Sequence, residues 1–166
     1  MQRLLPLAEQ VAAFLKSRDE TVAVAESSTG GLIAAALVAV PGASAYFVGG
    51  GVIYTVAAQR ALLNIPRDQM HGIRGSTQAY AQLGASTIRA RLATHWGIAE
   101  TGASGPTGNP YGDAAGHSCI ALSGPLDRAF TLETGSNDRV ENMRVFAHAA
   151  LQLLLDCLEQ APRTQR

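Results

Sequence analysis

Charge is scarce and evenly balanced in this sequence. Charged residues make up 16% of the 166 residues, and 13 Lys and Arg residues balance 13 Asp and Glu residues. A surface for nucleic acid or an anionic membrane needs clustered positive charge, and aromatic side chains, the platforms for base stacking, reach only 5%. We therefore expect neither a nucleic-acid nor a membrane partner, and so lightly charged a surface favours a homo-oligomer.

Cysteines and long apolar runs are also few. Cys119 and Cys157 lie far apart in apolar segments, which predicts buried free thiols rather than a zinc cluster. No run is long enough to cross a bilayer, and Glu9 and Lys16 interrupt the N-terminal apolar stretch, so the pattern of a signal peptide is missing. These absences together predict a cytoplasmic protein.

The apolar residues that are present follow the periods of helices and strands. At 47% of the chain they can fill the core of one domain without a disulfide or a metal. Helical spacing recurs over residues 3–17, 32–40, 57–63, 78–96 and 140–158. Short apolar runs predict strands at residues 21–25, 98–101, 117–122 and 129–134. Residues 45–54 contain three successive glycines and predict a strand, or a hairpin pair, bent at the glycines.

This order of elements predicts an α/β fold, a single-domain three-layer α/β/α sandwich. The sheet is expected to be mixed, because residues 117–122 and 129–134 read as an antiparallel hairpin. Ser136 or Asn137 is expected to cap the last helix. The domain is expected to span residues 1–160, followed by a polar tail at 161–166.

Two glycine-rich loops follow predicted strands. The first is Glu26-Ser27-Ser28-Thr29-Gly30-Gly31, and the second runs from Thr101 to Gly108. Ligands of α/β sheets collect at the carboxyl ends of strands. Free amides at a helix N-terminus suit an anion or an oxyanion, and a serine there can be a nucleophile. The same residues also form an ordinary helix cap and an ordinary turn, so both interpretations stay open.

The remaining polar candidates are histidines and one arginine. His71, His95, His117 and His148 show no spacing of metal ligands and are expected to be surface or core residues. Arg139, at the start of the last helix, is either solvated or a clamp for a phosphate or carboxylate. We expect no metal and no cofactor.

Taken together, these segments resemble the CinA C-terminal domain family, the nicotinamide mononucleotide deamidases of bacteria. The family's Glu-Ser-Cys-Thr-Gly-Gly hallmark is similar to Glu26–Gly31, and its Thr-Gly-Ile-Ala-Gly-Pro loop to Thr101–Pro106. Further likeness lies in Pro41–Phe47, in Gly50–Thr55 and, less closely, in Ser136–Arg139. The resemblance extends from residue 8 to about residue 158.

The resemblance implies a serine amidohydrolase that converts the carboxamide of a pyridine mononucleotide to the acid plus ammonia, without a cofactor. It implies that Ser27, the nucleophile, acts with Tyr54 and Thr101 as catalytic residues. The residues that it assigns to substrate binding are Thr29, Gly30, Gly31, Ser44, Gly102, Gly105 and Arg139. Arg139 would hold the phosphate, and the glycine loops would supply amides.

The sequence departs from the family pattern at two places. Family members carry a lysine five residues after the tyrosine, whereas this chain has Gln59, whose neutral amide cannot remove the serine proton. The segment Gly72–Ser76 also differs from the family's Gly-Ala-Val-Ser-Glu. Three hypotheses follow: a deamidase in which His71 or His117 has become the base, a nucleotide-binding member without turnover, or a hydrolase of another amide.

Overall fold

A five-stranded mixed sheet forms the centre of the molecule in the computed structural model, which describes residues 1–66 and 68–162. The strand order is β2-β1-β3-β4-β5. The strands are β1 (Val22–Glu26), β2 (Phe47–Val52), β3 (Trp96–Ala103), β4 (His117–Ser123) and β5 (Arg128–Glu133). The first three run parallel, and β4 and β5 continue the sheet as an antiparallel hairpin, which confirms the predicted mixed sheet.

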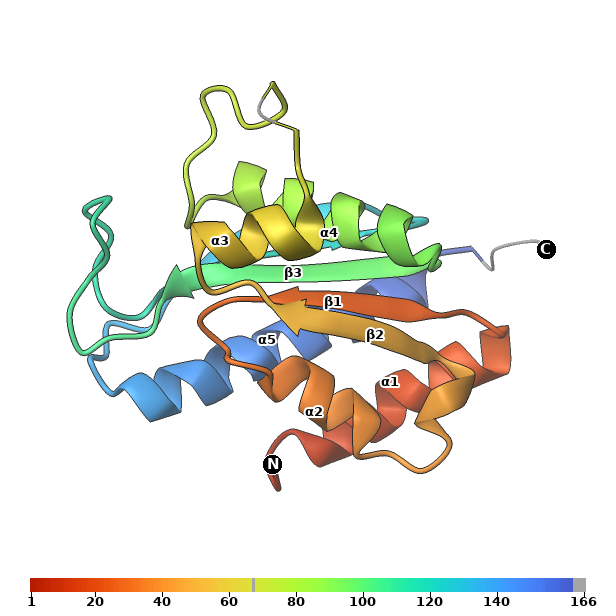
Figure 1. Cartoon of the computed structure of the whole chain (residues 1–166). Helices are drawn as coiled ribbons and strands as arrows, with labels where there is room; N and C mark the ends of the chain where they lie inside the picture. Colours follow the sequence, from red (N-terminus) through yellow and green to blue (C-terminus); the bar gives the residue numbers. More distant parts are fainter. Residues whose placement is uncertain (67, 163–166) are drawn as a thin grey trace.

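Helices cover both faces of this sheet (Figure 1). The helices on one face are α1 (Leu5–Arg18), α2 (Leu32–Val38) and α5 (Arg139–Gln160). On the other face lie α4 (Gln78–Leu92) and the short α3 (Val56–Ala58) with the π-turn η2 (Gln59–Leu63). Alternate residues of β1 enter the two layers, since Val22 and Val24 join the first core cluster and Ala23 and Ala25 the second. The three-layer α/β/α sandwich is therefore confirmed.

Glycines let helix α4 approach β3, and strand β2 approach β1, closely. A Cβ atom on Gly97 of β3 would lie 2.2 Å from the carbonyl oxygen of Ala85 in α4, and one on Gly50 of β2 would lie 2.4 Å from that of Val24. Both distances are shorter than any van der Waals contact, so only glycine fits at these positions. The predicted glycine-rich segment is thus one edge strand, not a hairpin pair, and its register with β1 shifts between Val22 and Ala23.

Two predicted helix boundaries are wrong. The helix expected to reach Trp96 ends at Leu92, because Ala93 takes a left-handed conformation with φ 50°. Trp96 instead opens β3, where its indole donates a hydrogen bond to Glu20. At the last helix the cap is Asp138, whose carboxylate accepts a hydrogen bond from the Glu141 amide 3.0 Å away; neither Ser136 nor Asn137 caps it.

The structure also shows where the two cysteines and the C-terminal residues lie. Cys119 and Cys157 are buried free thiols, as predicted. Ala161, the first residue of the predicted tail, packs into the core, and residues 163–166 lie outside the described residues. Within residues 1–66 and 68–162, no helix combines the length and the hydropathy needed to cross a bilayer.

Candidate functional site

A pocket of about 570 Å³ lies at the carboxyl ends of the parallel strands. Ser27 follows β1, Tyr54 follows β2, and Thr101 and Gly102 end β3; all four line the pocket. The parallel arrangement of these strands brings together residues more than 70 positions apart in sequence, at the sheet edge where α/β proteins bind ligands. The three residues expected to be catalytic therefore share one cavity.

Two buried glutamates lie beneath the first glycine-rich loop. Glu26 is 1% exposed and Glu100 is 2% exposed. The Glu100 carboxylate accepts hydrogen bonds from the amides of Ser27 (3.2 Å) and Thr29 (2.9 Å) and from the Ser28 hydroxyl. The backbone of this loop therefore faces a protein carboxylate rather than solvent.

The Glu26 carboxylate likewise accepts hydrogen bonds from backbone amides at the start of α2. The donors are the amides of Gly31 (3.0 Å), Ile33 (3.0 Å) and Ala34 (2.8 Å). Burial raises the pKa of Glu26 above its ordinary value and Glu100 raises it further, against the lowering effect of the Ala34 and Ile33 amides. The positive end of the helix thus stabilises Glu26 itself.

These contacts correct the expectation that the first loop offers several amides to a ligand. The Thr29 and Gly31 amides donate to the two glutamates, and the Gly30 amide donates to the Ser27 carbonyl oxygen. Within residues 27–34, which are all described, the amide of Ser28 alone has no acceptor in the structure. An oxyanion beside Ser27 would have this one amide from the loop, since the amides of Thr29, Gly30 and Gly31 are bonded within the protein and these three residues do not line the pocket.

Gln59 lies on the pocket wall with an unsatisfied amide. Its side chain is 7% exposed, and Nε2 has no hydrogen-bond acceptor among the described residues. Gln59 begins η2, where the Asn64 amide donates to the Gln59 carbonyl oxygen, a π-type bond over five residues. Such π-turns are frequent at functional sites. A buried donor without an acceptor favours a ligand that brings one.

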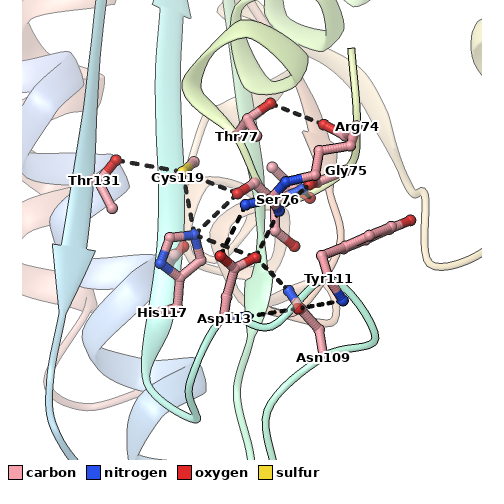
Figure 2. Close-up of polar contacts among 12 residues, drawn as sticks. Arg74, Gly75, Ser76, Thr77, Asn109, Tyr111, Asp113, His117, Cys119 and Thr131 are labelled. Carbon is pink, nitrogen blue, oxygen red and sulfur yellow. Dashed lines mark hydrogen bonds and ion pairs between the residues drawn. The ribbon is translucent and has the colours of Figure 1, made fainter. Parts of the chain in front are cut away.

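Another part of the wall comes from residues 73–76, in the segment where the sequence departs from the family pattern and which the hypothesis of another amide substrate places at the pocket. Arg74 lines the pocket, donates two hydrogen bonds to Asp113 (2.7 and 3.0 Å), and lies over the Tyr111 ring at 5.4 Å from its centroid. Arg74 lowers the pKa of Asp113 to about 2. Ser76 is 5% exposed and its amide donates to Thr101 Oγ1 at 3.2 Å. Figure 2 shows Arg74 and Ser76 of this wall beside Asp113 and His117.

Arg139 and Tyr54 form the rim. Arg139 donates to the Tyr54 hydroxyl at 3.0 Å and to the carbonyl oxygen of Gly105, so the second glycine-rich loop, the last helix and the segment after β2 meet here. Both side chains are exposed. A guanidinium held in this way lies beside the pocket rather than inside it, where it can reach the outer end of a bound ligand.

Ser44 is not brought to the pocket. It is exposed in the short 3-10 helix η1 (Ala43–Ala45), which precedes β2. The next residue but one, Tyr46, accepts a hydrogen bond from Val22 at the start of β1. Because parallel strands begin at the same edge of a sheet, Ser44 lies at the amino ends of the strands and the pocket at their carboxyl ends.

Neither histidine suggested as a replacement base faces Ser27. His71 is exposed and does not line the pocket. Both ring nitrogens of His117 contact oxygen atoms of other residues, Nδ1 that of Glu133 and Nε2 the carbonyl oxygen of Ser76 at 3.0 Å. The described residues that line the pocket include no histidine, lysine or carboxylate. Burial raises the pKa of Tyr80, another lining residue, so its phenol stays protonated at neutral pH.

Comparison with known proteins identifies the fold and the family. The model of the CinA C-terminal domain matches residues 4–158. The chain belongs to the CinA C-terminal domain family. A CinA-like protein of Gloeobacter violaceus is 40% identical over 150 residues, which are 89% of this chain and 35% of that protein. One of Myxococcus xanthus is 37% identical over 156 residues, which are 90% and 36%. The chain thus spans about a third of the length of these CinA-like relatives.

Solved structures of the CinA family share the architecture. A CinA superfamily protein of Klebsiella pneumoniae superposes with a TM-score of 0.88 at 25% identity, over 95% of this chain and 98% of that one. A competence/damage-inducible protein of Agrobacterium tumefaciens gives 0.86 at 27% identity, over 95% and 96%. These coverages match the α/β sandwich over nearly its whole length.

Glu100 is a residue of the site that sequence reasoning missed. Glu100 has a signal, an acidic residue inside the apolar run of β3, and such a residue is buried only when it has partners. The segment of Ser76 is singled out by its departure from the family pattern, but the sequence does not show the backbone conformation of Ser76, φ 56°, which is ordinary for glycine and uncommon for serine.

Proposed function

We propose that this pocket binds a pyridine mononucleotide that carries a carboxamide, and that the chain hydrolyses it slowly or not at all. The observation that carries the proposal is the buried, unpartnered Nε2 of Gln59 on the pocket wall. A primary amide offers one acceptor and a pair of donors, so it pairs in two places with a second primary amide. A ligand carboxamide would satisfy the Gln59 nitrogen that the protein leaves without an acceptor.

The other residues that line the pocket favour a ligand with a planar, positively charged ring. Tyr54, Tyr80 and Tyr111 line it, three of the four tyrosines of the chain. Aromatic faces attract a cation such as a pyridinium ring. The pocket volume of about 570 Å³ lies within the range of small-ligand pockets, roughly 300–1,000 Å³. Arg139 at the rim is the group that we assign to the phosphate.

Among the described residues that line the pocket there is no histidine, lysine or carboxylate, and the Glu100 carboxylate beside Ser27 already accepts the Ser27 and Thr29 amides, which favours binding over turnover. The serine hydroxyl is a weak nucleophile until a neighbouring group removes its proton. The resemblance implies a lysine at the position of Gln59. We infer that the glutamine leaves the reaction without its general base. Loss of a general base lowers a rate by about 10²–10⁴-fold.

Amide hydrolysis remains the second candidate, and one observation favours it. Ser27 is half-buried on the pocket wall, and the amide of the following residue, Ser28, has no acceptor among residues 1–66 and 68–162. The amide that follows a nucleophilic serine is a common oxyanion donor. Ser27 Oγ would then attack the carboxamide carbon while the Ser28 amide stabilises the charge that develops on the oxygen; the serine proton would pass to the nitrogen, the C–N bond would break to release ammonia, and water would hydrolyse the resulting ester to the acid.

Calorimetry and an ammonia assay separate these two functions. We expect nicotinamide mononucleotide to bind and to raise the melting temperature, the riboside without phosphate to bind more weakly, and ammonia release to be undetectable or slow. Turnover that Ser27→Ala abolishes would establish the hydrolase instead. Failure of every pyridine carboxamide to bind wild-type protein, with or without phosphate, would exclude both.

The variant Gln59→Met tests the observation that carries the proposal. Methionine preserves the length of the side chain and removes its hydrogen bonds. We expect about a fivefold or greater loss of affinity for the carboxamide, as a hydrogen bond is worth about 1 kcal/mol. An affinity equal to that of wild type would show that Gln59 does not contact the ligand.

A further inference from the structure

His117 lies directly behind the part of the pocket wall that Ser76 forms (Figure 2). It opens β4 and is 8% exposed. Its Nε2 lies 3.0 Å from the Ser76 carbonyl oxygen, and its Nδ1 contacts the Glu133 carboxylate on β5. A carbonyl and an ionised carboxylate can only accept hydrogen bonds, so both ring nitrogens must carry hydrogen. The geometry therefore selects the protonated imidazolium.

The charged and titratable groups around His117 come from every element packed against it. Glu133 lies on β5, Cys119 lies two residues along β4, and Asp113, on the loop before β4, is 4.0 Å from Nε2. Arg74, on the pocket wall, is paired to Asp113. Burial lowers the pKa of His117, but the Glu133 contact, the Ser76 carbonyl and Asp113 outweigh it, so the pKa lies above the ordinary value of 6.5.

Ser76 is held from both sides in a conformation that serine rarely takes. Its φ is 56°, in the left-handed region, where a non-glycine residue is strained unless its surroundings hold it. Its amide donates to Thr101 Oγ1 at 3.2 Å, and its carbonyl oxygen accepts from His117 and lies 3.5 Å from Cys119 Sγ. Because Thr101 Oγ1 accepts this bond, its own hydrogen is available to a group in the pocket.

We propose that His117 is a positioning residue: protonated, it fixes the Ser76–Thr101 wall of the pocket, and on losing its proton it releases that wall. The consequence for ligand affinity rests on the proposed function, whereas the movement of the wall does not. The pKa of His117 is raised in the folded protein, which means that folding favours the protonated ring. The wall is therefore held at pH values below 6.5 and is released as the pH rises through the pKa of His117 in the folded protein.

The contacts show which hydrogen bond is lost. On deprotonation the hydrogen stays on Nδ1, because the charged Glu133 carboxylate is a stronger acceptor than a carbonyl oxygen. The Nε2 lone pair then faces the Ser76 oxygen and repels it. Burial raises the pKa of Cys119, so its thiol keeps a hydrogen that it can donate to Nε2, 3.5 Å away. Ser76 thereby loses both donors to its carbonyl oxygen.

Nuclear magnetic resonance of the ligand-free wild-type protein tests the movement. We expect the amide shifts of Ser76 and Thr77 to change with the same midpoint as the ring nitrogens of His117, over about pH 5.5 to 9. Glu133→Gln should move that midpoint to lower pH, because it removes the charge that favours the imidazolium. A His117 ring that titrates while the Ser76 amide does not, or that does not titrate at all, would overturn the inference.

Binding of nicotinamide mononucleotide tests the consequence. We expect wild-type affinity to fall about fivefold as pH rises, equivalent to ~1 kcal/mol. His117→Gln, which keeps a donor at the position of Nε2 at every pH, should bind equally at each pH. His148→Gln alters an exposed histidine of α5 and should retain the wild-type pH dependence. A wild-type affinity that does not vary with pH would overturn the inference. If no ligand binds at any pH, the proposed function fails, and the nuclear magnetic resonance titration alone decides whether the wall moves.

Discussion

The buried carboxylates of Glu26 and Glu100 meet at a single hydroxyl group, that of Thr29. Thr29 Oγ1 is 2.8 Å from Glu26 Oε2 and 2.9 Å from Glu100 Oε2. A hydroxyl has one hydrogen to donate, so it cannot fully satisfy two ionised carboxylates at once. The raised pKa of Glu26 agrees with this arrangement, since a proton on Glu26 relieves the repulsion between the two groups. The loop that carries Ser27 rests on this pair.

Thr29→Val should destabilise the fold by about 2–3 kcal/mol, because valine keeps the shape but leaves two buried carboxylates without the hydroxyl. Thr29→Ser, which keeps the hydroxyl, should cost about 1 kcal/mol or less. Urea unfolding of both variants gives the comparison. Equal stabilities of Thr29→Val and wild type would show that the hydroxyl contributes nothing.

Gln59→Lys should raise ammonia release from nicotinamide mononucleotide by about 10²–10⁴-fold, because a lysine at this buried position has a lowered pKa and can take the serine proton. Adding Ser27→Ala to the variant should remove the gain. An unchanged rate in a folded Gln59→Lys variant that still binds the ligand would show that the missing base is not what limits turnover.

Asp113→Asn should weaken the attachment of the 73–76 wall to the loop before β4 and lower the melting temperature. Arg74 lowers the pKa of Asp113 from the ordinary value of 3.8 to about 2. The ionised Asp113 therefore stabilises the folded protein at pH values above 3.8, and this stabilisation is lost as the pH falls toward 2. The difference between variant and wild type should therefore be largest at neutral pH and vanish near pH 2. Asp127→Asn, in which the asparagine oxygen can still accept from Gly124, is the matched control.

Gly97→Ala should destabilise the protein by about 3 kcal/mol or more, because the new methyl group would lie 2.2 Å from the Ala85 oxygen and 2.7 Å from Arg89 Cβ. Gly84→Ala, on α4, places its methyl group 3.1 Å from Ala99 Cβ, and the gain in helix propensity offsets part of this crowding. Denaturant titration should rank Gly97→Ala as clearly the less stable variant. The reverse order would contradict the close packing of α4 on β3.

Self-association is expected at the edge strand β2. Val48 and Val52 are exposed on this strand and Val56 follows it, so unpaired backbone groups lie beside apolar side chains. Light scattering should give a mass above that of one chain, 17.3 kDa, and Val52→Lys should reduce it. A monomeric wild-type protein at high concentration would refute the expected homo-oligomer.

Local sequence patterns predicted most of the helices and strands, because side-chain period and turn residues act over a few positions. They failed where a distant partner decides the outcome. Trp96 reads as the end of a helix until Glu20 accepts its indole hydrogen. The Thr29 amide reads as a ligand-binding donor until Glu100, 71 residues further along the chain, accepts its hydrogen bond. Such a contact has no local signal.

The amino-acid sequence alone determined the family, the layered α/β architecture and the position of Ser27 at a strand end, since each rests on order and spacing along the chain. Only the tertiary structure decided that Ser44 lies at the far edge of the sheet, that the carboxylates of Glu26 and Glu100 accept hydrogen bonds from the loop amides, and that the Gln59 nitrogen has no acceptor among the described residues. The reason is physical: hydrogen bonds form between groups that the fold brings within about 3 Å, whatever their separation in sequence.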